Sequence, residues 1–204
     1  NLGRFIAAAR NPLSLGTLWE RDLQALPTLL QIFSTSQHLT DLLIRDPESY
    51  DLLRLTDGQP VARDVLVKEI GSEVSSLTKN ADVVTALRRY KDRETLRIAY
   101  GDIVRQQHIK TVTRQISFLA DAICEAATQV ARGKLEQKRG VPRNTDGDPA
   151  EFVILALGKL GGSELNYSSD IDLIFLYDGE GKTDGERSLS NQEFFQRLAR
   201  NIVA

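Results

Sequence analysis

Apolar and polar residues recur at helical spacing throughout residues 1–133. Short groups of cap and turn residues separate the apolar runs, and no stretch shows the convincing alternation of a half-buried strand. The clearest run covers residues 109–130, where apolar side chains lie three and four positions apart and therefore share one helix face. Such a stripe is much more often core than a groove for a cofactor or a partner. Residues 1–133 are therefore predicted to form an N-terminal helical bundle.

The character of the chain changes after Gly133. Residues 134–150, KLEQKRGVPRNTDGDPA, are polar, contain two prolines and two glycines, and show no periodicity. This composition is typical of a loop or of a connection between domains. We expect a linker over residues 134–150.

Residues 151–204 combine short apolar runs with turns. The runs at residues 152–157 and 171–177 have the length and composition of buried strands, and a glycine-rich turn lies between them. Residues 178–186, DGEGKTDGE, are expected to form an exposed loop. The order of elements therefore predicts an α+β fold, in which a helical region precedes a small sheet.

A capping box at Ser190 and Glu193 predicts a closing helix. The helical pattern continues to Ala204 without a stop signal such as Gly or Pro, and the sequence contains no methionine. We therefore expect this chain to be part of a longer protein, with a core at residues 151–204 that is truncated at its C-terminus.

The composition excludes several classes of protein. Lys and Arg total 26 against 28 Asp and Glu, a net charge of −2, which gives no global attraction to nucleic acid. The single cysteine, Cys124, lies in an apolar helical stretch and offers neither a disulfide framework nor a metal–thiolate site. No apolar run approaches the length of a membrane span, and no signal peptide is recognisable. We expect a cytoplasmic protein that binds neither nucleic acid nor membrane.

Two carboxylates mark the beginning of the second apolar run. Asp170 and Asp172 flank Ile171, and the two-residue period of a strand points both side chains to the same side, with about 7 Å between their α-carbons. Like charges at the mouth of an apolar strand repel each other unless a cation neutralises both. Hard oxygen ligands suit Mg²⁺ or Mn²⁺, so the pair predicts a metal-dependent catalytic centre.

A glycine-rich turn directly follows the first apolar run. Gly158, Gly161 and Gly162 lack side chains, which lets backbone N–H groups approach a phosphate closely, and Lys159 adds a cation. The turn has neither the Walker nor the Rossmann spacing. A strand, a glycine-rich turn and two carboxylates on a neighbouring strand together form the arrangement that phosphoryl or nucleotidyl transfer needs.

Each of these signals is weak when taken alone, because surface strands often begin with aspartate and glycine turns are common. Their combination, at this spacing and between two apolar strands, is a stronger signal. It predicts metal-dependent nucleotidyl transfer centred on Asp170 and Asp172.

The run GKLGGSELNYSSDIDLIFLYD, residues 158–178, resembles the signature of the glutamine synthetase adenylyltransferase family, a branch of the polymerase-β-like nucleotidyltransferases. In that superfamily a glycine followed by a small residue precedes Asp-x-Asp or Asp-x-Glu at a fixed interval. Gly158 stands at the matching interval, and Lys159 takes the place of the small residue. The similarity extends to SQHLTDLLIRDPE, LRRYKDRETLRIAYGD and TDGERSLSNQEFFQRLA, so it covers most of the chain.

The resemblance implies a fold, a reaction and partners. It implies a polymerase-β-like core, which is a mixed sheet with flanking helices. Members of the family have one half that transfers AMP from ATP to a tyrosine of glutamine synthetase and one half that removes it by phosphorolysis, which yields ADP. The wording NYSSDIDLIF and the TDG loop are more similar to the N-terminal, deadenylylating half. The family also implies control by the nitrogen-regulatory signal protein PII.

The resemblance also implies roles for particular residues. Asp170 and Asp172 would be the metal ligands and the catalytic carboxylates, and Ser169 would steady the turn. The nucleotide and its phosphates would bind at Gly158, Lys159, Gly161 and Gly162. The family has a third metal-binding carboxylate on a later strand, and no matching segment is present in this sequence.

Three other interpretations stay open. The chain can be the adenylylating half of the same enzyme, or a helical docking module with a degenerate transferase core. A nucleic-acid-extending nucleotidyltransferase would need a basic groove with stacking aromatic residues, and aromatic residues make up only 6% of this chain.

A basic cluster at residues 88–97 also has two interpretations. It can receive a phosphate or an acidic partner, or it can be paired within its own helix, because Glu94 and Arg97 are at helical pairing distance. We favour the structural interpretation.

Overall fold

The computed structural model describes residues 1–203 and divides into two compact units. The first, which we name the helical unit, consists of Asn1–Val61 and Arg88–Ile116. The second, which we name the motif unit, consists of residues 62–87 and the chain from Ser117 onward. Neither boundary falls in residues 134–150, and the predicted division into domains at residues 133 and 151 stays a prediction.

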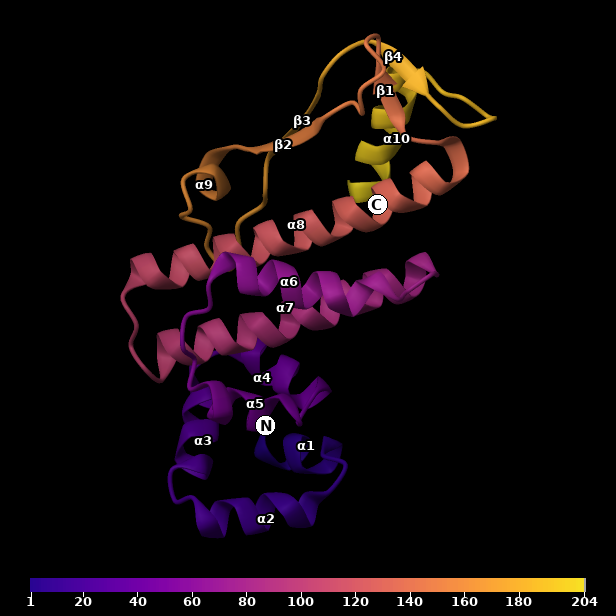
Figure 1. Cartoon of the computed structure of the whole chain (residues 1–204). Helices are drawn as coiled ribbons and strands as arrows, with labels where there is room; N and C mark the ends of the chain where they lie inside the picture. The colour runs from indigo at the N-terminus through magenta and orange to yellow at the C-terminus, as the bar shows by residue number, and fades with distance from the viewer. Residues whose placement is uncertain (204) are drawn as a thin grey trace. The chain divides into compact units, whose positions relative to one another are not determined.

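The helical unit contains five short helices and parts of two long ones (Figure 1). The short helices are α1 (Leu2–Ala8), α2 (Pro12–Arg21), α3 (Ala25–Thr35), α4 (Gln37–Arg45) and α5 (Ser49–Thr56), and the long ones are α7 (Asn80–Ile103) and α8 (Ile109–Arg139). Apolar side chains from α1, α3, α4 and α5 are buried together in one core. Phe5 lies at its centre, edge-on to Phe33 and Tyr50. The predicted helical N-terminal region is confirmed.

A buried polar network closes the helical unit where α7 and α8 meet the end of its first segment. Arg97 is 2% exposed and donates to Glu94 over 2.7 Å and to Gln115 over 3.0 Å. Gln115 also bonds the backbone of Val61, and Arg97 bonds the carbonyl of Gln59. Arg97 of the basic cluster is therefore a structural residue, as the pairing interpretation predicted.

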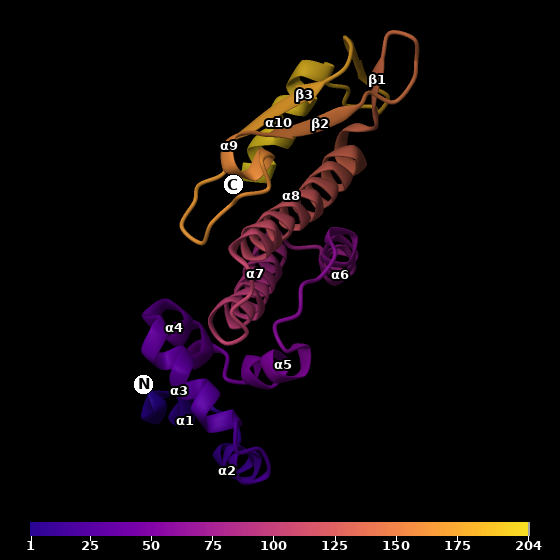
Figure 2. The same ribbon diagram turned by 90° about the vertical axis from the view of Figure 1, so that its left-hand side faces the viewer.

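The motif unit contains the remaining helices and the four strands of the described chain (Figure 2). Its helices are α6 (Arg63–Ser75), α9 (Gly158–Gly161) and α10 (Asn191–Val203), together with the adjoining parts of α7 and α8. Its strands are β1 (Pro142–Asn144), β2 (Phe152–Ala156), β3 (Leu173–Tyr177) and β4 (Gly181–Thr183). Strands β2 and β3 form one antiparallel pair, and β1 and β4 form another.

The closing helix α10 covers one face of the β2–β3 pair. Phe195 stacks on Phe152, with ring centroids 5.4 Å apart, and on Tyr177, with centroids 4.8 Å apart. The helix begins at the predicted capping box, because the amide of Glu193 donates to Ser190 Oγ and the amide of Ser190 donates to Glu193 Oε2, each over 3.2 Å. The prediction of a capped closing helix is confirmed.

The first part of the predicted linker, residues 134–139, is helical. Helix α8 continues to Arg139, because KLEQKR consists of good helix formers, Leu135 extends the buried stripe, and Arg132 pairs with Glu136 over 2.7 Å one turn away. Gly133, where the sequence pattern changes, lies within the helix and does not end it.

The exposed loop predicted at residues 178–186 is wrong in part. Residues of β4 lie in it and pair with β1, in register Pro142↔Thr183 to Asn144↔Gly181. Each strand is only three residues long, which is too short for a periodic signal.

The α+β fold class is confirmed: a helical N-terminal region precedes a small sheet. In residues 1–203 both strand pairs are antiparallel, so the mixed sheet implied by the resemblance is not seen in this part. None of the described helices combines the length and the apolar character needed to cross a membrane.

Candidate active site

The antiparallel pairing of β2 with β3 brings the two halves of the sequence motif together. The last ladder pair is Ala156 with Leu173, and one further bond, 2.9 Å from the amide of Leu157 to the carbonyl of Asp172, continues it. The glycine turn begins at the next residue, Gly158. A β-carbon placed on Gly158 would lie 3.7 Å from Asp172 Oδ2. The turn and the carboxylate of Asp172 therefore lie close together at this end of the strand pair.

Asp170 and Asp172 are both exposed and lie just before β3, which begins at Leu173 rather than at Ile171. Because Asp172 continues the ladder and side chains alternate along it, Asp172 belongs to the same face as Ile174 and Leu176. That is the face opposite to α10. Asp170 lies in the loop before β3 and is not part of the strand.

That face of the β2–β3 pair is apolar and open. Val153 and Leu155 on β2, and Ile174 and Leu176 on β3, are 41–53% exposed, whereas Phe152 and Phe175 on the other face are half-buried. The two runs were predicted as buried strands, and this prediction is wrong for one face. The reason is that the described residues supply one covering layer, α10, to one side of the sheet only.

The glycine turn forms the four-residue helix α9. Gly158 has φ +57°, in the left-handed region that favours glycine. Gly161 is required by space, because a β-carbon there would lie 2.5 Å from the carbonyl oxygen of Ala156 in β2. Gly162 has no such restriction, since the nearest atom would be 3.6 Å away. The turn is therefore built on two glycines with different roles, and the third is replaceable.

The amides of the turn differ in their availability. Those of Gly161 and Gly162 donate to the carbonyls of Leu157 and Gly158, over 3.2 and 3.1 Å. The first-turn amides of a helix have no partner within it, so the donors that α9 itself leaves free begin at Gly158 and Lys159. Phosphate binding by the turn stays a prediction, and in this structure Gly161 acts through close packing.

A small polar cluster connects the turn to the carboxylates. Lys159 Nζ donates to Ser169 Oγ over 3.4 Å, and Ser169 Oγ donates to Asn166 Oδ1 over 2.6 Å. Asn166 Oδ1 also accepts from the amide of Ser168 over 3.2 Å. Ser169 therefore lies between the predicted cation and the loop. The sequence interpretation missed Asn166, although an asparagine followed by serines is a recognised signal for a side-chain turn.

The carboxylate pair offers the kind of oxygen donors that suit a divalent cation whose remaining ligands come from a substrate and from water. In residues 1–203, no group of three or more His, Cys, Asp or Glu side chains could hold a metal ion. Mg²⁺ is commonly held by one or two carboxylates, with phosphate oxygens and waters completing the octahedron. Asp170 and Asp172, exposed and beside a glycine turn, supply oxygen donors of that kind.

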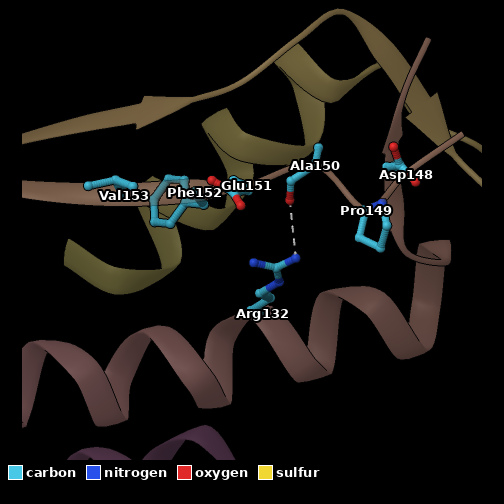
Figure 3. Close-up of a pocket in the computed structure, with 7 residues that line it drawn as sticks. All are labelled: Arg132, Asp148, Pro149, Ala150, Glu151, Phe152 and Val153. Atoms are coloured by element: carbon cyan, nitrogen blue, oxygen red, sulfur yellow. Dashed lines mark hydrogen bonds between the residues drawn. The ribbon is translucent and has the colours of Figure 1, made fainter. Parts of the chain in front are cut away.

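A separate pocket of about 560 Å³ lies between α8 and the start of β2 (Figure 3). Arg132 projects into it, donates to the carbonyl of Ala150 over 3.3 Å and is paired with Glu136. Asp148, Glu151 and apolar residues complete the lining. None of the predicted site residues lines this pocket, so it is not the candidate active site.

Comparison with known proteins identifies the family of the chain. The family described as glutamate-ammonia ligase adenylyltransferase matches residues 26–204; glutamate-ammonia ligase is another name for glutamine synthetase. Curated relatives share the name bifunctional glutamine synthetase adenylyltransferase/adenylyl-removing enzyme.

The relative from Thioalkalivibrio sulfidiphilus is 36% identical over 179 residues, which is 86% of this chain and 18% of the relative. The relative from Shewanella loihica is 34% identical over 200 residues, 91% of this chain and 21% of the relative. The relative from Shewanella frigidimarina is 34% identical over 205 residues, 97% of this chain and 21% of the relative. The chain thus spans about a fifth of the length of these relatives.

Proposed function

This chain belongs to the glutamate-ammonia ligase adenylyltransferase family, and we propose that its motif unit carries a metal-dependent nucleotidyl-transfer site for phosphorolytic removal of AMP from glutamine synthetase. The observation that carries the proposal is the junction at the end of β2, where Asp172 meets the glycine turn at Gly158. A carboxylate pair beside a glycine-rich turn is what this reaction needs from a protein.

Asp170 and Asp172 would hold Mg²⁺ or Mn²⁺. When bound there, the cation would supply charge stabilisation to the phosphoryl oxygens and to the departing phenolate. The family resemblance implies a third carboxylate on a later strand, and residues 1–203 offer no third metal-binding carboxylate beside the pair. Activity of the 204-residue chain alone is therefore a separate question from the identity of the site.

The reaction balances without a side-chain nucleophile. An oxygen of hydrogen phosphate forms a bond to the α-phosphorus of AMP-tyrosine, and the bond from that phosphorus to the phenolic oxygen breaks. The proton of hydrogen phosphate ends on the phenolate, so the products are ADP and a free tyrosine. Lys159 would attract the phosphate charge, and its ammonium group donates to Ser169 Oγ in the loop. Gly158, which has no side chain, would leave room for the approaching phosphate.

The direction of transfer is proposed from the motif wording. NYSSDIDLIF and the TDG loop are more similar to the deadenylylating half of the family than to the adenylylating half. The competing function is transfer of AMP from ATP to the synthetase tyrosine, which uses the same metal and carboxylate chemistry and releases pyrophosphate. The curated relatives are named for both activities. Control by PII is part of the same proposal, and no residue is assigned to it.

The product distinguishes the functions. The 204-residue chain, and any longer natural polypeptide that contains it, is incubated with adenylylated glutamine synthetase, phosphate and Mg²⁺, and ADP release is followed. We expect ADP from the active protein and none after Asp172→Asn. Pyrophosphate release from ATP and unmodified synthetase, with no ADP in the first assay, would reverse the assigned direction.

A matched control separates chemistry from folding. Asp178→Asn removes a neighbouring exposed carboxylate that follows β3 and accepts the amide of Glu151 rather than facing the turn. It should retain ADP release. Silence in both assays, with metal binding also absent, would favour a docking module with a degenerate transferase core.

A further inference from the structure

We infer that Ser117 is a positioning residue for the Asp170 and Asp172 pair, acting through the loop that connects α9 to β3. The inference rests on the proposed function of that pair. Ser117 lies on α8, 53 positions before Asp170 in the sequence, and nothing in the local sequence marks it as functional. Its contact with the loop is the observation that singles it out.

Ser117 is 1% exposed, and its Oγ accepts a hydrogen bond of 3.1 Å from the backbone amide of Leu165. Leu165 is 4% exposed, and Leu160 at the end of the glycine turn is 5% exposed. Figure 1 shows the loop after α9 reaching down to α8. A buried amide without a partner is costly. The hydroxyl of Ser117 therefore holds the loop at Leu165 against α8.

Asn166, the residue after Leu165, connects this anchored position to the carboxylates through hydrogen bonds. Asn166 bonds through its side chain to the amide of Ser168 and to Ser169 Oγ, and its carbonyl accepts the amide of Ser169 over 3.3 Å. Asp170 follows Ser169 directly. The path from Ser117 to Asp170 therefore consists of one hydrogen bond from α8 and a hydrogen-bonded turn of five residues.

Asp170 depends on this path more than Asp172 does. The carbonyl of Asp172 accepts the bond from the amide of Leu157 that continues the ladder, whereas Asp170 lies in the loop, two residues further from β3. The loop is thus what sets the position of one ligand relative to the other. Groups that orient metal ligands from outside the ligand set typically change metal affinity or activity by about 10- to 100-fold when they are removed.

The test measures Mn²⁺ affinity of the 204-residue chain by water-proton relaxation, together with amide hydrogen exchange at Leu165. In Ser117→Ala we expect faster exchange at Leu165 and a Mn²⁺ dissociation constant raised by about 10-fold. Ser117→Thr keeps the hydroxyl acceptor and should restore both values toward those of the unmodified chain. If Ser117 had a merely structural role, Ser117→Ala would lower the free energy of unfolding, but the Mn²⁺ dissociation constants of Ser117→Ala and Ser117→Thr would be the same.

Thr128→Val is the matched control on the same helix, because its hydroxyl bonds only the carbonyl of Cys124 one turn back, over 2.7 Å. It should change neither measurement. Faster exchange at Leu165 with unchanged Mn²⁺ affinity in Ser117→Ala would overturn the inference, and so would unchanged exchange.

If Ser117→Ala does not fold, Asn166→Ala tests the same path at an exposed position. It should weaken Mn²⁺ binding similarly, and unchanged binding would overturn the inference. Failure of the proposed function has a different signature. In that case the unmodified chain binds no Mn²⁺, or Asp172→Asn binds it equally well, and the inference falls together with the function.

Discussion

The helical unit and the β2–β3 pair of the motif unit use apolar residues in opposite ways. In the helical unit, Phe5, Leu29 and Leu43 have no exposed surface, and even an arginine, Arg97, is buried with its partners satisfied. In the β2–β3 pair, Leu155 and Leu176 keep about half of their surface exposed. The first region buries its apolar residues on all sides, whereas the second is held by backbone pairing and by aromatic packing against α10 on one face only.

The difference has a functional meaning. Asp172 remains accessible because the face of the sheet to which it belongs is not covered by the described residues, and Asp170, in the loop before β3, is exposed as well. The same openness removes the packing that would hold them in position, so the loop relies on hydrogen bonds at Asn166 and Leu165 instead. The proposed metal ligands and the most deeply buried apolar residues thus lie in different parts of this chain.

The largest expected effect is in the helical unit. Arg97→Met removes the nearer of two cations from the buried Glu94, which keeps only Arg93 at 3.6 Å, and leaves the carbonyl of Gln59 without its donor. Breaking a buried ion pair on one side typically lowers the free energy of unfolding by about 3–5 kcal/mol, and urea unfolding measures it. The control is Arg63→Met, whose pair with Asp121 is 45% and 35% exposed and should contribute at most about 1 kcal/mol. Equal effects in the two variants would break the comparison.

The next effect distinguishes two neighbouring glycines in the motif unit. Gly161→Ala places a β-carbon 2.5 Å from the Ala156 carbonyl oxygen, and because the obstacle is the backbone of β2, the turn must move. We expect a loss of about 1–3 kcal/mol, as for overpacked sites. Gly162→Ala meets nothing closer than 3.6 Å and should stay within about 0.5 kcal/mol. Thermal unfolding of both variants measures this, and a tolerated Gly161→Ala would show that the turn is not tightly packed.

A smaller effect is expected on the open face of the sheet. Leu176→Thr replaces a half-exposed leucine with a residue of good strand propensity, so the free energy of unfolding should change by only about 0.5 kcal/mol. Leu198→Ala in α10, where the side chain is fully buried, should cost about 2–5 kcal/mol. A large loss of unfolding free energy in Leu176→Thr would mean that the open face is covered in solution. The contrast between a buried helical core and an open sheet face would then no longer hold.

The sequence predicted the parts of this molecule that depend on local chemistry. The stripe of α8 and the capping box at Ser190 both follow from spacing over a few residues. The pairing of β1 with β4 was missed because each strand has three residues and its partner lies 41 positions away at Pro142 and Thr183. The anchoring of Leu165 by Ser117 was missed for the same reason, since a contact across 48 positions leaves no local signal.

The smallest effect concerns one carboxylate at the surface of each unit. The side chain of Arg143 and the backbone amide of Val141 hold the pKa of Asp184 below its ordinary value of 3.8. For Asp22 the largest cause of the lowered pKa is the amide of Gln24, and the side chain of Arg54 comes second. A carboxyl with a lowered pKa in the folded state stabilises the fold above the unfolded value, and this stability is lost as the pH falls through the folded value.

Removing the arginine should therefore act unequally in the two units. In Arg143→Gln, Asp184 loses the larger cause of its lowered pKa, so stability should fall at neutral pH and decline less steeply below about pH 4. In Arg54→Gln, Asp22 keeps the amide of Gln24, and the acid dependence should change less. Urea unfolding from about pH 6 down to about pH 2.5 measures the slope, which reports the protons bound on unfolding. A steeper acid decline in Arg143→Gln would contradict the assigned cause, because it would mean that Asp184 still binds its proton with the lowered pKa once the guanidinium is gone.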